Sequence, residues 1–102
     1  MVSKGLLIRL HAQPGRDADV VAFLESVIPL VDAEPATTAL LAVRFGPSEY
    51  GIINAFPDDT GMQAHFAGHA AAGLSEQAAN LFAAPPAIEP LEILASKLPG
   101  PM

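Results

Sequence analysis

The sequence predicts a single α+β domain, with a four-stranded antiparallel sheet that carries its helices on one face. Three observations predict it. Short runs of branched aliphatic residues alternate with segments whose apolar residues recur at three- and four-residue steps. Turn signals rich in Gly and Pro separate these segments. A short GPSE turn joins two of the apolar runs, as in an antiparallel hairpin. The chain has 102 residues, 51% of them hydrophobic, enough for one folded domain with its core at about 5–97.

The first part of the chain predicts a strand, a helix and a second strand. The first strand is GLLIRLHA (5–12), which the turn signal QPGR closes. A helix then starts at Asp17 and ends at AEPAT (33–37), with a bend at Pro29 because proline removes one backbone donor. The second strand is TTALLAVRF (37–45). The helix is predicted by its periodic apolar residues, namely Val20, Leu24, Val27, Ile28 and Val31.

The second part predicts a strand, a helical region and a last strand. The third strand is YGIINAF (50–56), and Asp58, Asp59 or Thr60 can cap the helix that follows. We expect this helix from about Thr60 to Ala72, with a break at Gly73 before a short helix to Phe82. The last strand is IEPLEILASK (88–97). The resulting β-α-β-β-α-β order is the ferredoxin-like arrangement, with helices on one face of the sheet.

The predicted strands are apolar on both faces, although a sheet open to water on one side normally alternates apolar with polar residues. In the second strand, one face carries Ala39, Leu41, Val43 and Phe45, and the other carries Thr38, Leu40 and Ala42. The face without helices therefore needs a cover. A second copy of the chain is the simplest cover, so we expect a homodimer. Arg9 and His11 would lie in its interface, with Glu89 or Glu92 as the acidic partner of the arginine.

Composition argues against several classes of partner. Five basic and eleven acidic residues give a net charge of −6, with no basic stripe for a nucleic-acid backbone. The chain has no cysteine, so disulfides, thiolate metal sites and a cysteine nucleophile are excluded. No apolar run reaches the ~20 residues that a membrane helix requires, and none near the N-terminus has the length of a signal-peptide core. We therefore expect a cytoplasmic protein with neither a membrane nor a nucleic-acid partner.

Two histidines four residues apart, His65 and His69, are the main candidates for chemistry. On one helix they share a stripe with Met62, Phe66 and Gly73, so their face turns inward. Three interpretations stay open: a histidine hydrogen-bonded at the edge of the core, a pocket residue that transfers protons, or a metal-binding pair. A metal site needs at least a third protein ligand. The nearest acidic residues suit the helix start better, so we expect no metal.

Three segments together resemble the antibiotic biosynthesis monooxygenase family, over about 5–97: LLIRLHAQPGRDADVVAFL, ALLAVRFGPSEYGIINAFPDDTGMQAHFAGHAA and EPLEILASK. The resemblance implies a dimeric α+β barrel in which two sheets pack face to face. The family includes cofactor-independent oxygenases that convert anthrones or quinols to quinones, and haem-degrading enzymes. The haem-degrading branch uses an Asn, a Trp and a His, at positions held here by Ile8, His65 and Ser75. This chain has no Trp, so we do not expect haem degradation.

The resemblance and the residues together suggest a monooxygenase that uses no cofactor and oxidises a small aromatic phenol, quinol or anthrone with molecular oxygen. His65 would accept the substrate proton, Asn54 or Arg44 would stabilise the anion, and Phe56 would stack on the ring. Asn54 could instead bond to backbone, and Phe56 could simply pack in the core. The alternative function is a non-catalytic dimeric module that binds a hydrophobic small molecule. The residues expected to contact the ligand are Phe56, Phe66, His69 and Arg44.

Overall fold

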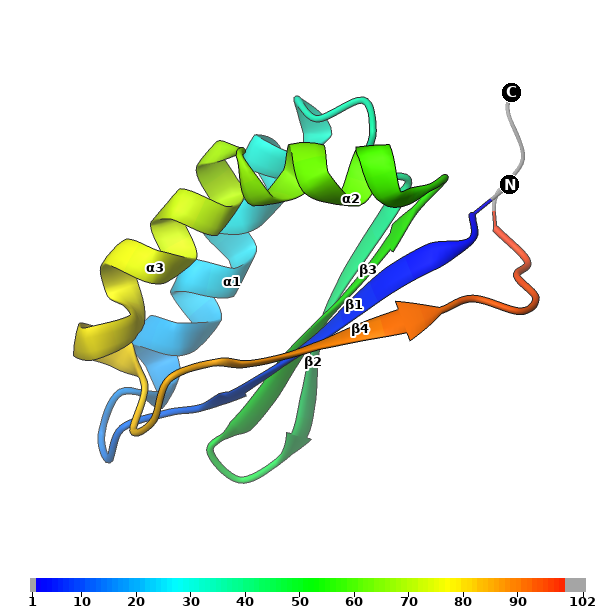
Figure 1. Cartoon of the computed structure of the whole chain (residues 1–102). Helices are drawn as coiled ribbons and strands as arrows, with labels where there is room; N and C mark the ends of the chain where they lie inside the picture. The colour runs from blue at the N-terminus through cyan, green and yellow to red at the C-terminus, as the bar shows by residue number, and fades with distance from the viewer. Residues whose placement is uncertain (1, 99–102) are drawn as a thin grey trace.

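A computed structural model gives the structure of residues 2–98, with the backbone alone for His69 and Ala70. Within this range a four-stranded antiparallel sheet of order β2-β3-β1-β4 carries the helices on one face (Figure 1). No helix in the described range has the length and apolar character needed to cross a membrane. The expected ferredoxin-like order is confirmed. The elements are β1 (Lys4–His11), α1 (Asp17–Asp32), β2 (Ala39–Gly46), β3 (Glu49–Phe56), α2 (Asp59–Phe66), α3 (His69–Leu81) and β4 (Ala87–Glu92).

The last strand is shorter than the sequence predicts, ending at Glu92 instead of residue 97. Within the described residues it pairs with β1 alone, which begins at Lys4, opposite Glu92. One further backbone bond, from Ile93 N to Ser3 O at 2.9 Å, continues the pairing. Residues 94–98, the last that the structure describes, form no further strand. The length of β4 is therefore set by the start of β1.

The predicted helix break at Gly73 is wrong, because the chain turns at Ala67 and Gly68 and Gly73 lies inside α3. A β-carbon on Gly68 would lie only 2.6 Å from Glu34 Oε2, so a side chain at this point would have to shift that carboxylate. A β-carbon on Gly73 would meet nothing nearer than Phe23 at 3.9 Å. His65 and His69 consequently belong to different helices, and the continuous stripe predicted for them does not exist.

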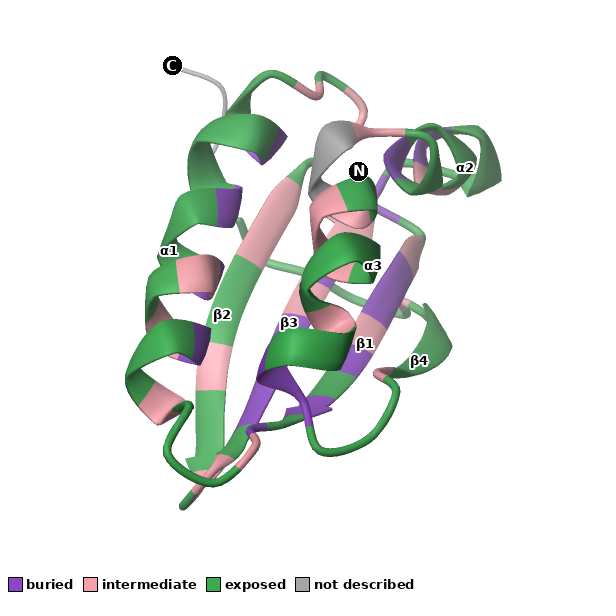
Figure 2. Cartoon of the chain, turned by 90° about the vertical axis from the view of Figure 1, so that its left-hand side faces the viewer, coloured by how far each residue is buried: buried purple, intermediate pink, exposed green. Residues whose placement is uncertain are grey.

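The core lies between the sheet and the helices, and Figure 2 shows buried residues recurring along β1 and β3 on the strands that α1 and α3 cover. Leu6 is fully buried on β1, and Phe56 is fully buried on β3. The periodic face of α1 packs on this side of the sheet as expected, with Val20 and Leu24 in one buried cluster with Ile8, Leu10, Tyr50 and Ile52. Ile28 is the exception, since it is 40% exposed. The buried residues of that helix are Val20, Leu24, Val27 and Val31.

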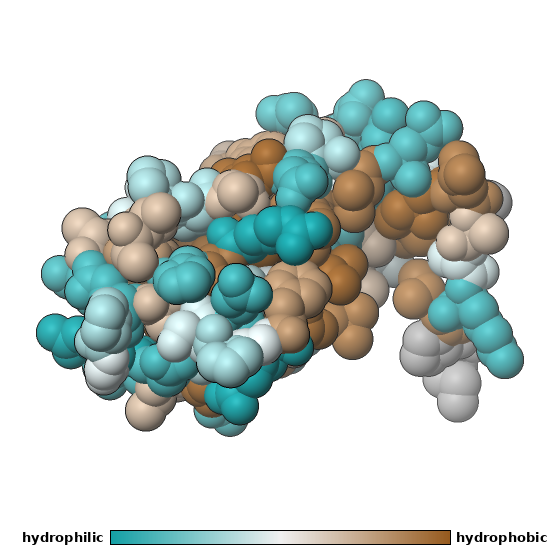
Figure 3. All heavy atoms as spheres, turned by 90° about the horizontal axis from the view of Figure 1, so that it is seen from below, coloured by the Kyte–Doolittle hydropathy of each residue, from teal (hydrophilic) through white to brown (hydrophobic). Residues whose placement is uncertain are grey.

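The opposite face of the sheet has no cover within the described residues, and it is apolar. Figure 3 views the molecule from this side and shows hydrophobic side chains gathered over the middle and right of the face. Leu41 and Phe45 of β2 are 57% and 49% exposed there. Arg9 of β1 lies over the Phe45 ring at 5.2 Å and pairs with Glu89 at 2.8 Å, the acidic partner suggested by the sequence.

Leu6→Ala tests this division of the sheet into a buried and an exposed face. Because Leu6 is fully buried, its loss should leave a cavity and lower the free energy of unfolding by about 2–5 kcal/mol. Leu94→Ala is the matched control, since Leu94 is 84% exposed and should change stability by less than about 0.5 kcal/mol. Urea unfolding of both variants measures the difference. Equal losses would contradict the burial assigned to β1.

Candidate functional site

A cavity of about 360 Å³ lies between the sheet and the helices, and every strand and helix contributes to its wall. Among the side chains that the structure describes, the lining is apolar except for Asn54, His65 and Ser75. Small side chains on one face of α3 leave the space open, since Ala71, Ser75 and Ala78 recur there at four- and three-residue steps. The other lining residues are Ile8, Phe23, Val27, Leu40, Ile52, Phe66, Leu74, Pro86 and Ile88.

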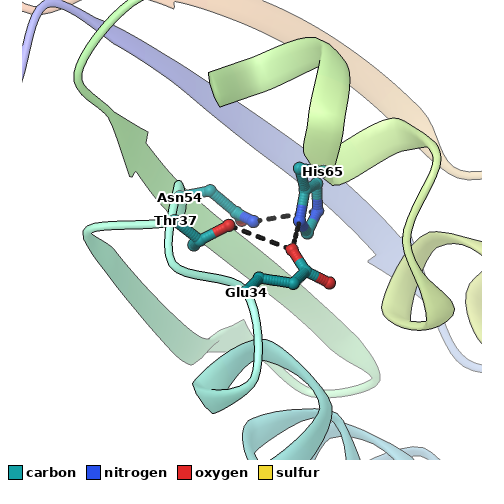
Figure 4. Close-up of polar contacts among 4 residues, drawn as sticks. All are labelled: Glu34, Thr37, Asn54 and His65. Atoms are coloured by element: carbon teal, nitrogen blue, oxygen red, sulfur yellow. Dashed lines mark hydrogen bonds and ion pairs between the residues drawn. The ribbon is translucent and has the colours of Figure 1, made fainter. Parts of the chain in front are cut away.

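A hydrogen-bonded network forms the polar end of this cavity (Figure 4). His65 Nδ1 lies 2.8 Å from Glu34 Oε1, and His65 Nε2 lies 3.2 Å from Asn54 Nδ2. Thr37 Oγ1 donates a second hydrogen bond to Glu34 Oε1, at 3.0 Å. An ionised carboxylate only accepts hydrogen bonds and an amide nitrogen only donates them. The neutral imidazole therefore carries its proton on Nδ1 and accepts at Nε2.

Each member of this network is positioned by a different part of the fold. Asn54 points toward the helices from the middle of β3, between Leu6 and Leu40 on the neighbouring strands. His65 sits near the end of α2, a helix that Asp58 caps by accepting from Gly61 N at 3.0 Å. The turn after α1 carries Glu34, whose N–H donates to Val31 O at 2.8 Å. The three side chains thus meet between β3, the end of α2 and the turn after α1.

Two buried oxygen atoms of the network, Asn54 Oδ1 and Glu34 Oε2, have no hydrogen-bond partner among the described residues. Leaving a buried acceptor unpaired costs about 1–3 kcal/mol. Asn54 is 1% exposed and lines the cavity, so its free oxygen can accept a hydrogen bond from a molecule bound there. The site is consequently built to receive a ligand or water that donates a hydrogen bond.

Three of the candidate residues from the sequence meet at this site, namely Asn54, His65 and Phe66, which is 42% exposed. Phe56 lies behind the site, fully buried, with its ring centroid 5.4 Å from that of His65. Arg44 lies outside the cavity. The side chain of His69 falls outside the described part of the structure.

Arg44 belongs instead to a group that ties the β2–β3 hairpin to the start of α1. Its Nη2 donates to Tyr50 Oη at 3.3 Å, and its guanidinium lies 5.2 Å above the Tyr50 ring. Tyr50 Oη in turn donates to Asp17 Oδ2 at 2.9 Å, and Ser48 Oγ donates to Asp17 Oδ1 at 3.2 Å. The Arg44 guanidinium therefore contacts Tyr50 outside the cavity, where it cannot stabilise an anion bound inside.

Glu34 is the member of this network that the sequence did not point to. It lies in AEPAT, which reads only as the end of a helix, and 31 positions separate it from His65. No local pattern connects two residues at that distance. Among the side chains that the structure describes, no group of three or more His, Asp or Glu could hold a metal ion.

Solved structures share this fold over nearly their whole length. A protein of unknown function from Nitrosomonas europaea is 48% identical, with a TM-score of 0.96 over 99% of this chain and 98% of that one. A Mycobacterium tuberculosis protein is 16% identical, with a TM-score of 0.82 over 92% and 97%. A candidate antibiotic biosynthesis monooxygenase from Caulobacter crescentus is 17% identical, with a TM-score of 0.78 over 92% of each chain.

Neither protein-family models nor curated proteins give a match to this sequence. At 16% and 17% identity, the Mycobacterium and Caulobacter structures establish a common fold alone. The similarity to the Nitrosomonas protein is much closer and extends from end to end. The chain therefore belongs to the same family as the Nitrosomonas europaea protein of unknown function, and it has the fold of the candidate antibiotic biosynthesis monooxygenases.

Proposed function

We propose that this protein is a cofactor-independent monooxygenase that oxidises a small aromatic phenol, quinol or anthrone with molecular oxygen. The observation that carries the proposal is the buried His65, whose Nε2 accepts a hydrogen bond at the polar end of an otherwise apolar cavity. Candidate monooxygenases from Caulobacter crescentus and Chloroflexus aurantiacus have the same fold, which supports the class of reaction.

The reaction needs a base and a dry pocket, because oxygen reacts slowly with a closed-shell phenol but accepts an electron from its anion. For an anthrone, His65 Nε2 removes a proton to give the enolate, which transfers one electron to oxygen. The radical pair then forms a carbon–oxygen bond, and a proton converts the peroxide to a hydroperoxide. Loss of the second ring C–H proton breaks the O–O bond and releases water. One oxygen atom remains as the new carbonyl, so the quinone and water balance the anthrone and oxygen.

Charge in the cavity is balanced by the network itself. No lysine or arginine is among the described lining residues, so the anion forms against the imidazolium of His65. Once Nε2 has taken the substrate proton, it no longer accepts from Asn54 Nδ2. That amide N–H then becomes free to donate to the oxyanion at the place where the charge develops. Proton transfer and anion stabilisation are coupled in this way.

The second candidate function is a module that binds a hydrophobic small molecule without turnover. The predominance of apolar side chains in the cavity wall supports this alternative, because it favours binding of a ring system by itself. The unpaired Asn54 Oδ1 would hold such a ligand through one donated hydrogen bond. Binding and catalysis differ only in whether the His65 base is used.

We further propose that two copies of the chain associate through the apolar outer faces of their sheets. Leu41 and Phe45 are large apolar side chains that stay exposed on this face of β2. Monomeric proteins seldom expose extended apolar patches of this kind. The Arg9–Glu89 pair is already satisfied within one chain, so its burial in such an interface would not leave an unpaired charge.

His65→Ala should lower turnover by about 10²–10⁴-fold, the usual effect of removing a general base. Oxygen uptake and quinone formation on a panel of anthrones and hydroquinones measure the rate, and ¹⁸O₂ should place one labelled atom in each quinone. His11→Ala is the matched control, since His11 is exposed and lies on β1 outside the cavity. If every substrate on the panel is bound but none is oxidised, the binding module is correct instead.

Leu41→Glu should convert a dimer into monomers, because a charge buried in the outer-face interface would have no partner. Multi-angle light scattering at micromolar concentration gives the mass directly, against 10.6 kDa for one chain. Ala42→Glu is the control, because Ala42 is also exposed but pairs with Ile52 on the helix side of the sheet. A monomeric wild-type protein would disprove the proposed association.

A further inference from the structure

We infer that Glu34 is a positioning residue that acts through His65, and that Gly68 is required to seat its carboxylate. The carboxylate would hold the imidazole in the tautomer that presents an accepting Nε2 to the cavity, and would balance the imidazolium that proton transfer creates. The kinetic part of this inference rests on the proposed oxygenase function. The tautomer itself is a property of the resting protein and can be tested without any substrate.

The contact geometry favours a functional pairing over incidental packing. Glu34 Oε1 and His65 Nδ1 are 2.8 Å apart, with side chains only 16% and 6% exposed, so water competes little for either group. Thr37 donates to the same oxygen and fixes the direction of the carboxylate. A hydrogen bond at one ring nitrogen sets the protonation of the other, which is how acidic residues orient histidines in many sites.

Gly68 provides the second, independent observation. A β-carbon there would lie 2.6 Å from Glu34 Oε2 and 3.1 Å from its Cδ, so any other residue would displace the carboxylate. The N–H of the same glycine donates to His65 O at 2.9 Å. The absence of a side chain at Gly68 therefore leaves room for the Glu34 carboxylate, and the Gly68 backbone bonds to His65. The break between α2 and α3 places this glycine where both contacts are possible.

The location of Gly68 also favours a charged carboxylate. Gly68 is the N-cap of α3, a helix of 13 residues. The N-terminal end of a helix carries a partial positive charge that attracts anions. Glu34 Oε2 has no hydrogen-bond partner among the described residues, and its closeness to this helix end compensates part of the cost of burying it. The pair is thus arranged so that the negative charge remains on Glu34 while the proton moves at Nε2.

Two variants separate the charge from the position of the carboxylate. Glu34→Gln keeps the shape of the side chain and removes its charge, so kcat should fall about 10- to 100-fold with KM little changed, as for other partners of functional histidines. Gly68→Ala alters neither member of the pair, but its new methyl group should displace the carboxylate and lower kcat in the same direction. Thermal melting of each variant confirms that it remains folded.

Matched controls isolate the effect of each change. Gly73→Ala introduces the same methyl group into α3 where it would meet only Phe23 at 3.9 Å, so turnover should remain at the wild-type rate. Glu76→Gln removes an exposed carboxylate from α3 outside the cavity lining and should also leave kcat unchanged. A loss of kcat in Glu34→Gln and Gly68→Ala, but not in these controls, supports the positioning role.

The decisive measurement is the ¹⁵N NMR signature of the His65 ring in the resting protein. The neutral ring of the wild type should carry its proton on Nδ1, and Gly68→Ala should move the population toward the Nε2-protonated tautomer. An Nε2-protonated ring in the wild type, or a signature unchanged by Gly68→Ala, would overturn the inference even if the oxygenase reaction is observed. The expected signature without any turnover would instead retain the positioning role and reject the oxygenase.

Discussion

Glu34 and His65 lie 31 residues apart in the chain, yet Glu34 Oε1 and His65 Nδ1 are 2.8 Å apart inside the protein. Several parts of the fold are needed to form this contact. A buried carboxylate is costly unless it is paired. Glu34 lies in the turn after α1, and His65 lies near the end of α2. Gly68 leaves the space in which the carboxylate sits, and the helix layer breaks there. Asn54 of β3 completes the network from the sheet.

The cavity combines an apolar wall with a polar end that is only partly satisfied. Small residues on α3 keep that helix from filling the space, and Asn54 keeps a buried oxygen without a partner. Both features reduce stability, since a well-packed core would fill the cavity and pair every polar atom. Local features that reduce stability in this way are characteristic of functional sites. The same features leave an apolar cavity in which Asn54 Oδ1 is free to accept one hydrogen bond.

The two faces of the sheet therefore have different physical roles. Alternate residues of β3 direct Asn54 and Phe56 toward the helices, while their neighbours point outward. The outer face carries no network comparable to the one around His65 among the described residues. Two of its charged groups, Arg9 and Glu89, pair with each other across neighbouring strands. The outer surface would suit the proposed association of two copies, and the cavity on the other face would suit the proposed chemistry.

The sequence by itself determined the order of the strands and helices, because hydrophobic periodicity is a local property of these elements. It did not reveal Glu34, whose partner is distant in the chain, or the break at Gly68, which depends on the space that a distant carboxylate occupies. The sequence suggested Arg44 as a hydrogen-bond donor to a substrate anion. In the fold, its guanidinium instead lies over the Tyr50 ring, and the Tyr50 hydroxyl donates to Asp17. The end of β4 likewise depended on where β1 begins. Tertiary structure decided these features because each arises from contact between segments that no local pattern connects.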